Sequence, residues 1–187
     1  ARETQAALDE YDRVLKTDPA HEEAVVYKSQ VLVEEGRGTE AVKSLRGFMK
    51  KSPDSVLAAY YLGRAEQHLG HFDEAVRAYR KAIELRPGFV QGSLALGYLY
   101  EEKRMNPQAV VVYKALYDES QDLTAANRLA TIFLKDEKYE QSIPYLEAVQ
   151  ASDPDDMNVR VKLGLVEMEL KRYEKAIVTF NSILEKN

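Results

Sequence analysis

The stretch Val56–Phe89, VLAAYYLGRAEQHLGHFDEAVRAYRKAIELRPGF, decides the fold because it contains two consecutive runs with helical spacing. In the first run Ala59 and Gly63 fall on one helical face, and in the second Ala75 and Tyr79 do the same. Each run is long enough for three to four helical turns. The stretch therefore predicts two α-helices in immediate succession.

Residues suited to ending one helix and starting another separate the two runs. Gly70 supplies the positive-φ residue with which helices commonly end, and Asp73 offers a carboxylate to the positive end of the next helix dipole. Pro87 closes the second run, because proline cannot continue a helix. We therefore expect two antiparallel helices joined by a tight turn.

The same pattern recurs along the whole chain, with copies 34, 34, 34, 33 and 34 residues apart, which indicates a repeat protein. The second helix of each copy opens with a small residue, and a bulky residue follows it. The small residues are Ala7, Ala41, Ala75, Ala109, Ser142 and Ala176, and the bulky residues are Tyr11, Leu45, Tyr79, Tyr113, Leu146 and Phe180. The first helix of each complete copy also carries a small residue at one fixed place. These residues are Ser29, Gly63, Gly97, Ala130 and Gly164. Small residues on both helices predict a close crossing within each pair.

The copies differ in how their helices stop. Prolines close four of them, at Pro19, Pro53, Pro87 and Pro154, with Gln121 in the equivalent place of the remaining copy. The turn of the first complete copy contains Gly36 and Gly38. In the third copy we expect Asn106 to cap a helix that Pro107 begins. The turns of the last two copies contain Lys138 and Lys171. Pro144 lies inside a predicted helix, where we expect a small local distortion.

With its Leu-Gly pairs at Leu62-Gly63, Leu96-Gly97 and Leu163-Gly164, its alanines and its closing prolines, the unit resembles the tetratricopeptide repeat. The resemblance implies an all-α, right-handed superhelical solenoid of antiparallel helix pairs, with about five and a half repeats in one domain. A hairpin cannot bury its apolar face alone, so each copy must pack on its neighbours. We expect a half repeat at 1–21, full repeats at 22–55, 56–89, 90–122, 123–156 and 157–187, and a longer parent protein.

The resemblance also implies a concave groove, lined by the first helices, that binds a peptide or helix of another protein. Tyrosine and arginine are enriched where binding energy concentrates, and several gather on this face; the alternative is that the tyrosines pack between adjacent first helices. The predicted partner-binding residues are Val26, Tyr27, Gln30, Tyr60, Tyr61, Arg64, Leu94, Tyr98, Asn127, Arg128 and Thr131.

The chemistry of this face predicts the kind of partner. Its first three copies are aromatic, whereas Lys135 and Lys162 join the polar residues of copies four and five to make a mildly basic section. A segment with apolar anchors followed by acidic residues would suit both sections. The Lys, Asn and Arg clamp with which some family members hold a chaperone tail is absent, since the matching places of the second copy hold Tyr60, Tyr61 and Arg64.

Composition argues against several other classes of function. The net charge of -5, from 31 acidic and 26 basic residues, provides no positive field for nucleic acid, and no run of about 18 apolar residues could cross a membrane. The chain contains no cysteine, which excludes thiol chemistry. The absence of cysteine fits both oxidising and reducing compartments, so the cellular compartment stays undetermined. His21, His68 and His71 lack the further ligands that a metal needs. No cofactor or catalytic motif is evident, so we do not expect an enzyme.

Two alternatives remain open at this point. The chain could be a structural module that self-associates through exposed apolar faces, or the regulatory arm of a larger multidomain protein. The leading interpretation is an interaction scaffold that binds a protein or peptide.

Overall fold

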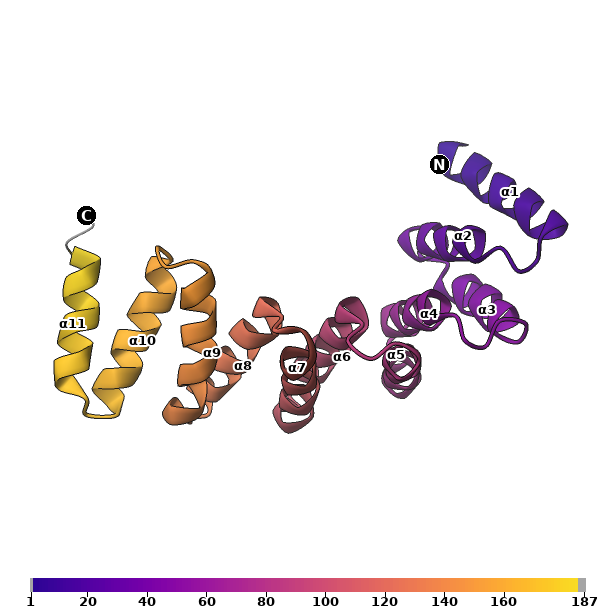
Figure 1. Cartoon of the computed structure of the whole chain (residues 1–187). Coiled ribbons are helices and arrows are strands. Elements are labelled where there is room, and N and C mark those ends of the chain that lie inside the picture. Colours follow the sequence, from indigo (N-terminus) through magenta and orange to yellow (C-terminus); the bar gives the residue numbers. More distant parts are fainter. Residues whose placement is uncertain (1, 185–187) are drawn as a thin grey trace. The chain divides into compact units, whose positions relative to one another are not determined.

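The structure, a computed structural model, describes residues 2–184 and is all-α, as predicted. Its regular elements in that range are eleven helices (Figure 1). They are α1 (Arg2–Thr17), α2 (Glu22–Glu34), α3 (Gly38–Met49), α4 (Val56–His68), α5 (Phe72–Leu85), α6 (Val90–Glu102), α7 (Asn106–Ser120), α8 (Leu123–Lys135), α9 (Tyr139–Ser152), α10 (Met157–Glu169) and α11 (Tyr173–Leu184). None of these helices combines the length and the apolar character that a bilayer-spanning segment requires.

The helices form two compact units, one ending at Arg104 and the other beginning at Met105. The first unit contains α1 to α6 and the second contains α7 to α11. Within each unit, helices that follow one another in the sequence pack side by side (Figure 1). Each helix is therefore held mainly by its neighbours along the chain, as expected for a repeat architecture.

Polar side chains cap most of the first helices. The side chains of His21, Ser55, Asp122 and Asp156 each accept a hydrogen bond from a backbone N–H in the first turn of α2, α4, α8 and α10. Such caps satisfy N–H groups that have no partner inside the helix. Phe89 takes this place before α6 and has no capping bond; its side chain is buried instead. The sequence interpretation missed these caps.

The turn inside each hairpin contains one residue in the left-handed conformation. Gly70 has φ +76°, as predicted, and Gly36 has φ +74°. The equivalent residues of the later copies are Arg104, Glu137 and Lys171, with φ of 57°, 56° and 58°. A side chain in this conformation costs about 1 kcal/mol or more. Packing of the two helices therefore maintains the turn in copies whose residue disfavours it.

The start of α7 differs from the sequence prediction. The predicted capping role of Asn106 is wrong: the N-cap of α7 is Met105, Asn106 is already helical and Pro107 lies in the first turn. Pro107 fits there because the first turn has N–H groups without partners. Gln121 ends α7 in a left-handed conformation, with φ 55°, where the other copies carry proline. α9 continues on both sides of Pro144.

The helices of a pair cross closely, as the small residues predict. A Cβ atom added at Gly63 would lie 2.5 Å from Cδ1 of Tyr79, and one added at Gly164 would lie 2.7 Å from the ring of Phe180. Tyr79 and Tyr113 are fully buried, in agreement with their predicted packing role. The place of Tyr173 in the repeat also predicts a packing residue, but Tyr173 is 55% exposed, because no described helix covers its side of α11.

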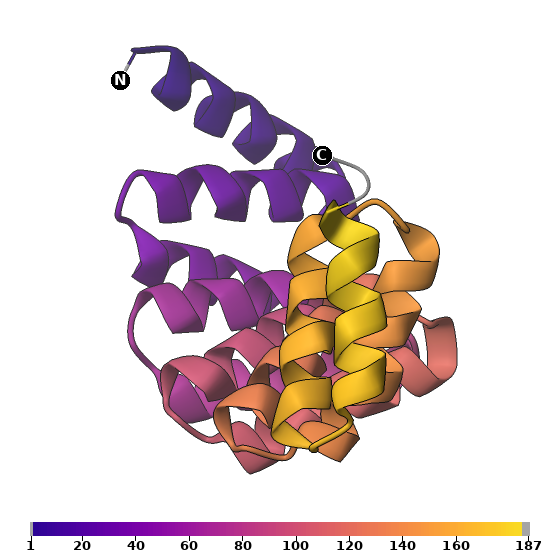
Figure 2. The same cartoon turned by 90° about the vertical axis from the view of Figure 1, so that its left-hand side faces the viewer.

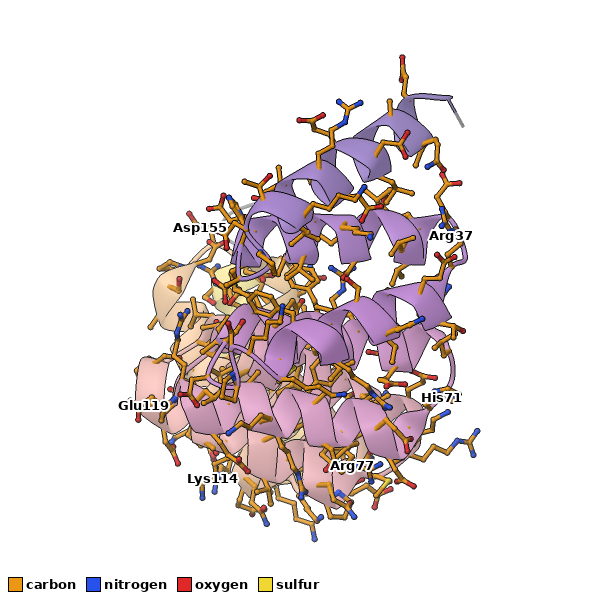
Figure 3. All side chains as sticks on the ribbon, turned by 90° about the vertical axis from the view of Figure 1, so that its right-hand side faces the viewer. Arg37, His71, Arg77, Lys114, Glu119 and Asp155 are labelled. Atoms are coloured by element: carbon orange, nitrogen blue, oxygen red, sulfur yellow. The ribbon has the colours of Figure 1, made fainter. Side chains whose placement is uncertain are left out.

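A buried carboxylate links three elements of the first unit. The side chain of Glu66, on α4, is 1% exposed. Arg46 Nη2, from α3, donates to it at 2.6 Å, and Nδ1 of His71, before α5, lies 2.8 Å from its second oxygen. Figure 3 shows Arg37 and His71, which precede α3 and α5, on the same edge of the unit. His71 therefore has a structural role.

Candidate functional site

A cavity of about 410 Å³ opens on the first unit, between helices contributed by copies one to three. Most of its lining comes from first helices, with one residue from α5. We call it the Arg64 pocket; its lining residues are Val33, Tyr60, Arg64, Gln67, His68, Tyr79, Ala95 and Tyr98. Aromatic rings thus surround a single guanidinium, an arrangement suited to an apolar group beside an anionic one.

Tyr60 forms part of both the pocket and the core. Its ring lies 5.5 Å from that of Phe89, edge to face, and 5.9 Å from that of Tyr79. The neighbouring Tyr61 ring is 5.0 Å away, also edge to face. These contacts hold the Tyr60 ring in place, so the pocket wall is rigid and a ligand would lose little entropy in ordering it.

Arg64 gives the pocket its positive charge. Its side chain is exposed, and its Cζ atom lies 5.5 Å from the centre of the Tyr61 ring. Among the described residues, its guanidinium makes no ion pair with a carboxylate. Contact with the aromatic face orients the guanidinium. Arg64 can therefore receive an anion without first breaking an internal ion pair.

The phenols at the base of the pocket are held in their neutral form. Burial raises the pKa of Tyr79 above its usual range, and burial also raises the pKa of Tyr60, with Arg64 acting in the opposite direction. The Tyr79 hydroxyl donates to Oε1 of Gln67 at 2.7 Å. This bond joins α5 to α4 at the edge of the pocket and fixes the Gln67 amide.

These raised pKa values predict a loss of stability at high pH. An ordinary tyrosine has a pKa of 10.0, and burial of Tyr79 raises its pKa in the folded protein. The stabilisation that comes from burying the neutral Tyr79 phenol is thus fully present below pH 10.0. It is lost as pH rises above that value. Thermal unfolding followed across this pH range should show a falling midpoint, and Tyr79→Phe should flatten the fall. An equally steep fall in Tyr79→Phe would contradict this assignment.

The structure separates the predicted aromatic residues into two groups. Tyr60, Arg64 and Tyr98 line the Arg64 pocket. Tyr61 instead makes a hydrogen bond with Gln30 of α2, between adjacent first helices, as the packing alternative expected. Tyr27 is 49% exposed and does not line the pocket.

Two predicted residues are placed differently from expectation. Val26 is 4% exposed and packs in the core with Leu45 and Ala58, so its side chain is not available to a ligand. The prediction that Val26 contacts a partner is therefore wrong, because the neighbouring core side chains cover it. Leu94 does not line the Arg64 pocket; its neighbour Ala95 does. A one-residue difference rotates a helical side chain by about 100°.

Copies four and five differ in the residues that they carry on the face predicted to be polar and mildly basic. Asn127 is exposed, Arg128 is partly buried, and the Thr131 hydroxyl donates to the backbone oxygen of Asn127 at 2.8 Å. On α10, however, Leu165 is 51% and Met168 47% exposed. The described residues of copy four on this face are thus polar, while copy five also presents apolar side chains there.

Several residues of the pocket lie outside the predicted partner-binding set. Val33 and Gln67 occupy the last place of the same helical face in copies one and two, so the helical spacing that places Tyr60 and Arg64 on this face also places them there. His68 is the last residue of α4 and lies outside that spacing, and Tyr79 comes from a second helix. The position of Tyr79 follows from the close crossing at Gly63.

The histidines do not form a metal site in the described residues. His21 caps α2, and His71 pairs with Glu66. Across residues 2–184 there is no group of three or more His, Cys, Asp or Glu side chains arranged to hold a metal ion.

Comparison with protein families agrees with the repeat architecture. Models described as tetratricopeptide repeat match residues 56–89 and residues 1–56 with 127–187. The chain belongs to the tetratricopeptide repeat family.

Curated relatives are distant and much longer. The TPR repeat-containing protein MJ1428 of Methanocaldococcus jannaschii is 22% identical over 87% of this chain and 29% of its own length. Anaphase-promoting complex subunit 3 of Schizosaccharomyces pombe is 25% identical over 96% of this chain and 27% of its own length. The chain thus spans less than a third of the relatives that it matches.

Solved structures share the fold. YrrB, described as a TPR protein with an unusual peptide-binding site, is 12% identical with a TM-score of 0.69, over 94% of this chain and 91% of YrrB. MamA from Desulfovibrio magneticus RS-1 is 20% identical with a TM-score of 0.62, over 96% of this chain and 94% of MamA. At these identities the similarity concerns the fold alone.

Proposed function

We propose that the chain is a protein-interaction scaffold that binds a segment of a partner protein in the Arg64 pocket, without catalysis or cofactor. The observation that carries the proposal is a rigid aromatic cavity containing an arginine without an ion pair among the described residues. A guanidinium such as that of Arg64 can hold a carboxylate with two parallel hydrogen bonds.

The lining indicates the chemistry of the partner. Tyr60 and Tyr98 present aromatic faces, and Val33 and Ala95 add aliphatic surface around Arg64. A peptide with one acidic side chain next to an aromatic or aliphatic residue would place its carboxylate on Arg64 and its apolar group on the rings. Apolar groups alone would fit less well, because Arg64 would lose water without gaining a partner.

The comparisons support binding over catalysis. The matching family models describe tetratricopeptide repeats, a family whose members generally mediate protein–protein interactions. YrrB is described as having a peptide-binding site, and anaphase-promoting complex subunit 3 is by its name part of an assembly. Neither identifies the partner of this chain, which the chemistry of the pocket describes only by class.

Synthetic peptides test the proposal. A short peptide with one glutamate between tyrosine and leucine should bind the wild-type protein, and exchanging that glutamate for glutamine should weaken binding. Arg64→Ala should weaken binding of the glutamate peptide about tenfold or more, since hydrogen bonds between charged groups contribute roughly 1.5–3 kcal/mol. The glutamine peptide should bind both proteins equally, which isolates the pair of interacting groups.

Arg77→Ala is the matched control. Arg77 is an exposed arginine of α5 that pairs with Glu74 one turn away and does not line the pocket. It should leave the affinity for both peptides unchanged. Equal loss in Arg64→Ala and Arg77→Ala would indicate a general charge effect, and unchanged binding in folded Arg64→Ala would remove the proposal.

A further inference from the structure

The side-chain amide of Gln67 is fixed at the wall of the Arg64 pocket. Gln67 lies on α4, which packs on α2 and α5 (Figure 2 shows the stacked helices of the first unit, from α1 at the top downward). The Tyr79 hydroxyl donates to Oε1 of Gln67 at 2.7 Å, and Tyr79 is 0% exposed. Burial raises the pKa of Tyr79, so this phenol keeps the proton that it donates. A buried hydroxyl without an acceptor would be costly, so Oε1 is committed to Tyr79.

This bond leaves the other end of the amide, Nε2, available to a ligand. Nε2 of a glutamine carries two N–H donors. Among residues 2–184 the side chain of Gln67 makes no hydrogen bond other than the one from Tyr79. Because the amide group is planar, holding Oε1 at Tyr79 also limits the directions in which Nε2 can point. Toward a ligand, Gln67 therefore acts as a hydrogen-bond donor.

The Gln67 amide and the Arg64 guanidinium form one donor surface. The two residues are three positions apart on α4 and line the same cavity. Side chains at this spacing are neighbours on a helical face. Arginine has no acceptor, and the acceptor of the Gln67 amide is already occupied by Tyr79. A carboxylate can accept from both side chains, whereas a ligand amide would bring its own NH2 group against donors.

The other copies show that the residues in these two places are matched. Gln67 and Tyr79 are 12 positions apart, and every complete copy has the same two places. Where the second helix carries leucine or phenylalanine, the first helix carries an apolar residue, and where it carries tyrosine, the first helix carries a polar one. The pairs are Val33 with Leu45, Gln67 with Tyr79, Glu101 with Tyr113, Leu134 with Leu146, and Met168 with Phe180. A polar residue thus accompanies the tyrosine hydroxyl.

Copy two differs from copy three in the kind of polar residue. An ionised carboxylate, such as that of Glu101, only accepts hydrogen bonds, whereas the Gln67 amide accepts from Tyr79 and still has donors. A glutamate at position 67 would also accept from Tyr79, but it would place a negative charge three residues from Arg64. Glutamine keeps Arg64 available to an anion and adds a neutral donor beside it.

We propose that Gln67 is a specificity-determining residue of the Arg64 pocket and that Tyr79 is a positioning residue that acts through it. A carboxylate of the partner accepts from the Arg64 guanidinium and from Nε2 of Gln67. The uncharged side chain of glutamine or asparagine is disfavoured, because the fixed amide offers it no acceptor. This inference rests on the function proposed above, and it adds the residues that distinguish an acidic side chain from its amide.

The ratio of the affinities for the glutamate peptide and the glutamine peptide measures this discrimination. Fluorescence anisotropy with labelled peptides and the whole chain gives both affinities. Tyr79→Phe keeps the buried ring but releases Oε1 of Gln67, so the amide can turn and accept from a ligand NH2 group. The glutamine peptide should then bind more tightly, and the ratio should fall about threefold or more, as expected for one hydrogen bond. Gln67→Met should lower the ratio similarly, through weaker binding of the glutamate peptide.

The double variant Tyr79→Phe/Gln67→Met separates positioning from packing. If Tyr79 acts through Gln67, adding Tyr79→Phe to Gln67→Met should leave the ratio unchanged. A further fall would overturn the positioning role of Tyr79. Circular dichroism should show the variants folded; if Tyr79→Phe does not fold, Gln67→Met alone tests the role of Gln67, and an unchanged ratio in that variant would overturn it.

Tyr113→Phe is the matched control. Tyr113 occupies the place of Tyr79 on α7, is also 0% exposed and does not line the pocket. It should leave the ratio unchanged, and an equal fall in both variants would overturn the proposal. Arg64→Ala separates this inference from the proposed function. Intact glutamate-peptide binding in Arg64→Ala would overturn both, whereas weakened binding there with an unchanged ratio in Gln67→Met would overturn the role of Gln67 alone.

Discussion

The Gly63→Leu variant is expected to lose much of its stability. Gly63 lies where α4 crosses α5, and even a Cβ atom there would come within 2.5 Å of the Tyr79 ring. That ring is 0% exposed and packs against the Tyr60 ring, whose centre lies 5.9 Å away. Overpacking of this kind costs about 1–3 kcal/mol, and a leucine at so close a crossing should reach the upper end or exceed it. Urea unfolding followed by circular dichroism measures the change.

Gly47→Ala provides the comparison within the same unit. Gly47 lies in the last turn of α3, is exposed, and would have no atom within 4 Å of a new Cβ. Alanine there should raise stability by about 0.5–1 kcal/mol, because glycine is a poor helix former. Opposite signs for the two substitutions would establish the crossing as the cause. A stable Gly63→Leu protein would mean that the helices can separate without loss.

The second large effect is expected from removing Arg46. Without it, His71 at 2.8 Å is the one side-chain partner left to Glu66 among residues 2–184, and Glu66 remains 1% exposed. Leaving a buried carboxylate poorly compensated is costly, but the Arg46 side chain is 55% exposed, so water can replace part of the interaction. Arg46→Ala should therefore cost about 1–3 kcal/mol. Urea unfolding at neutral pH tests this.

Arg37→Ala serves as the control for Arg46→Ala. Arg37 pairs with Glu40 three residues away, and both side chains are well exposed. Exposed pairs of this type contribute little because water screens them. The variant should unfold at nearly the wild-type urea concentration. If Arg46→Ala does the same, the Glu66 network is not a stabilising link between α3 and α4.

The fold could be predicted from the sequence because its signals repeat. Small residues such as Ala75 and Gly63 identify the crossing, and the period fixes where each hairpin begins. The conformation of Arg104 and Glu137 could not be predicted, since neither residue favours positive φ. It follows from helix packing, which is a property of the folded chain and not of the residue.

The candidate site was predictable only in part. Periodicity placed Tyr60, Arg64 and Tyr98 on one face, and these three side chains do line one cavity. Their role in binding stays a prediction. Periodicity gave no means of telling that Val26 is buried and that its neighbour Tyr27 is exposed. Deciding between them requires the position of the next helix.

The side-by-side packing of consecutive helices has a consequence for how such proteins change length. Because the helix interfaces within a unit join helices of the same or adjacent copies, adding or removing a whole copy leaves the remaining interfaces intact. Duplication of a coding segment can thus lengthen the array one hairpin at a time.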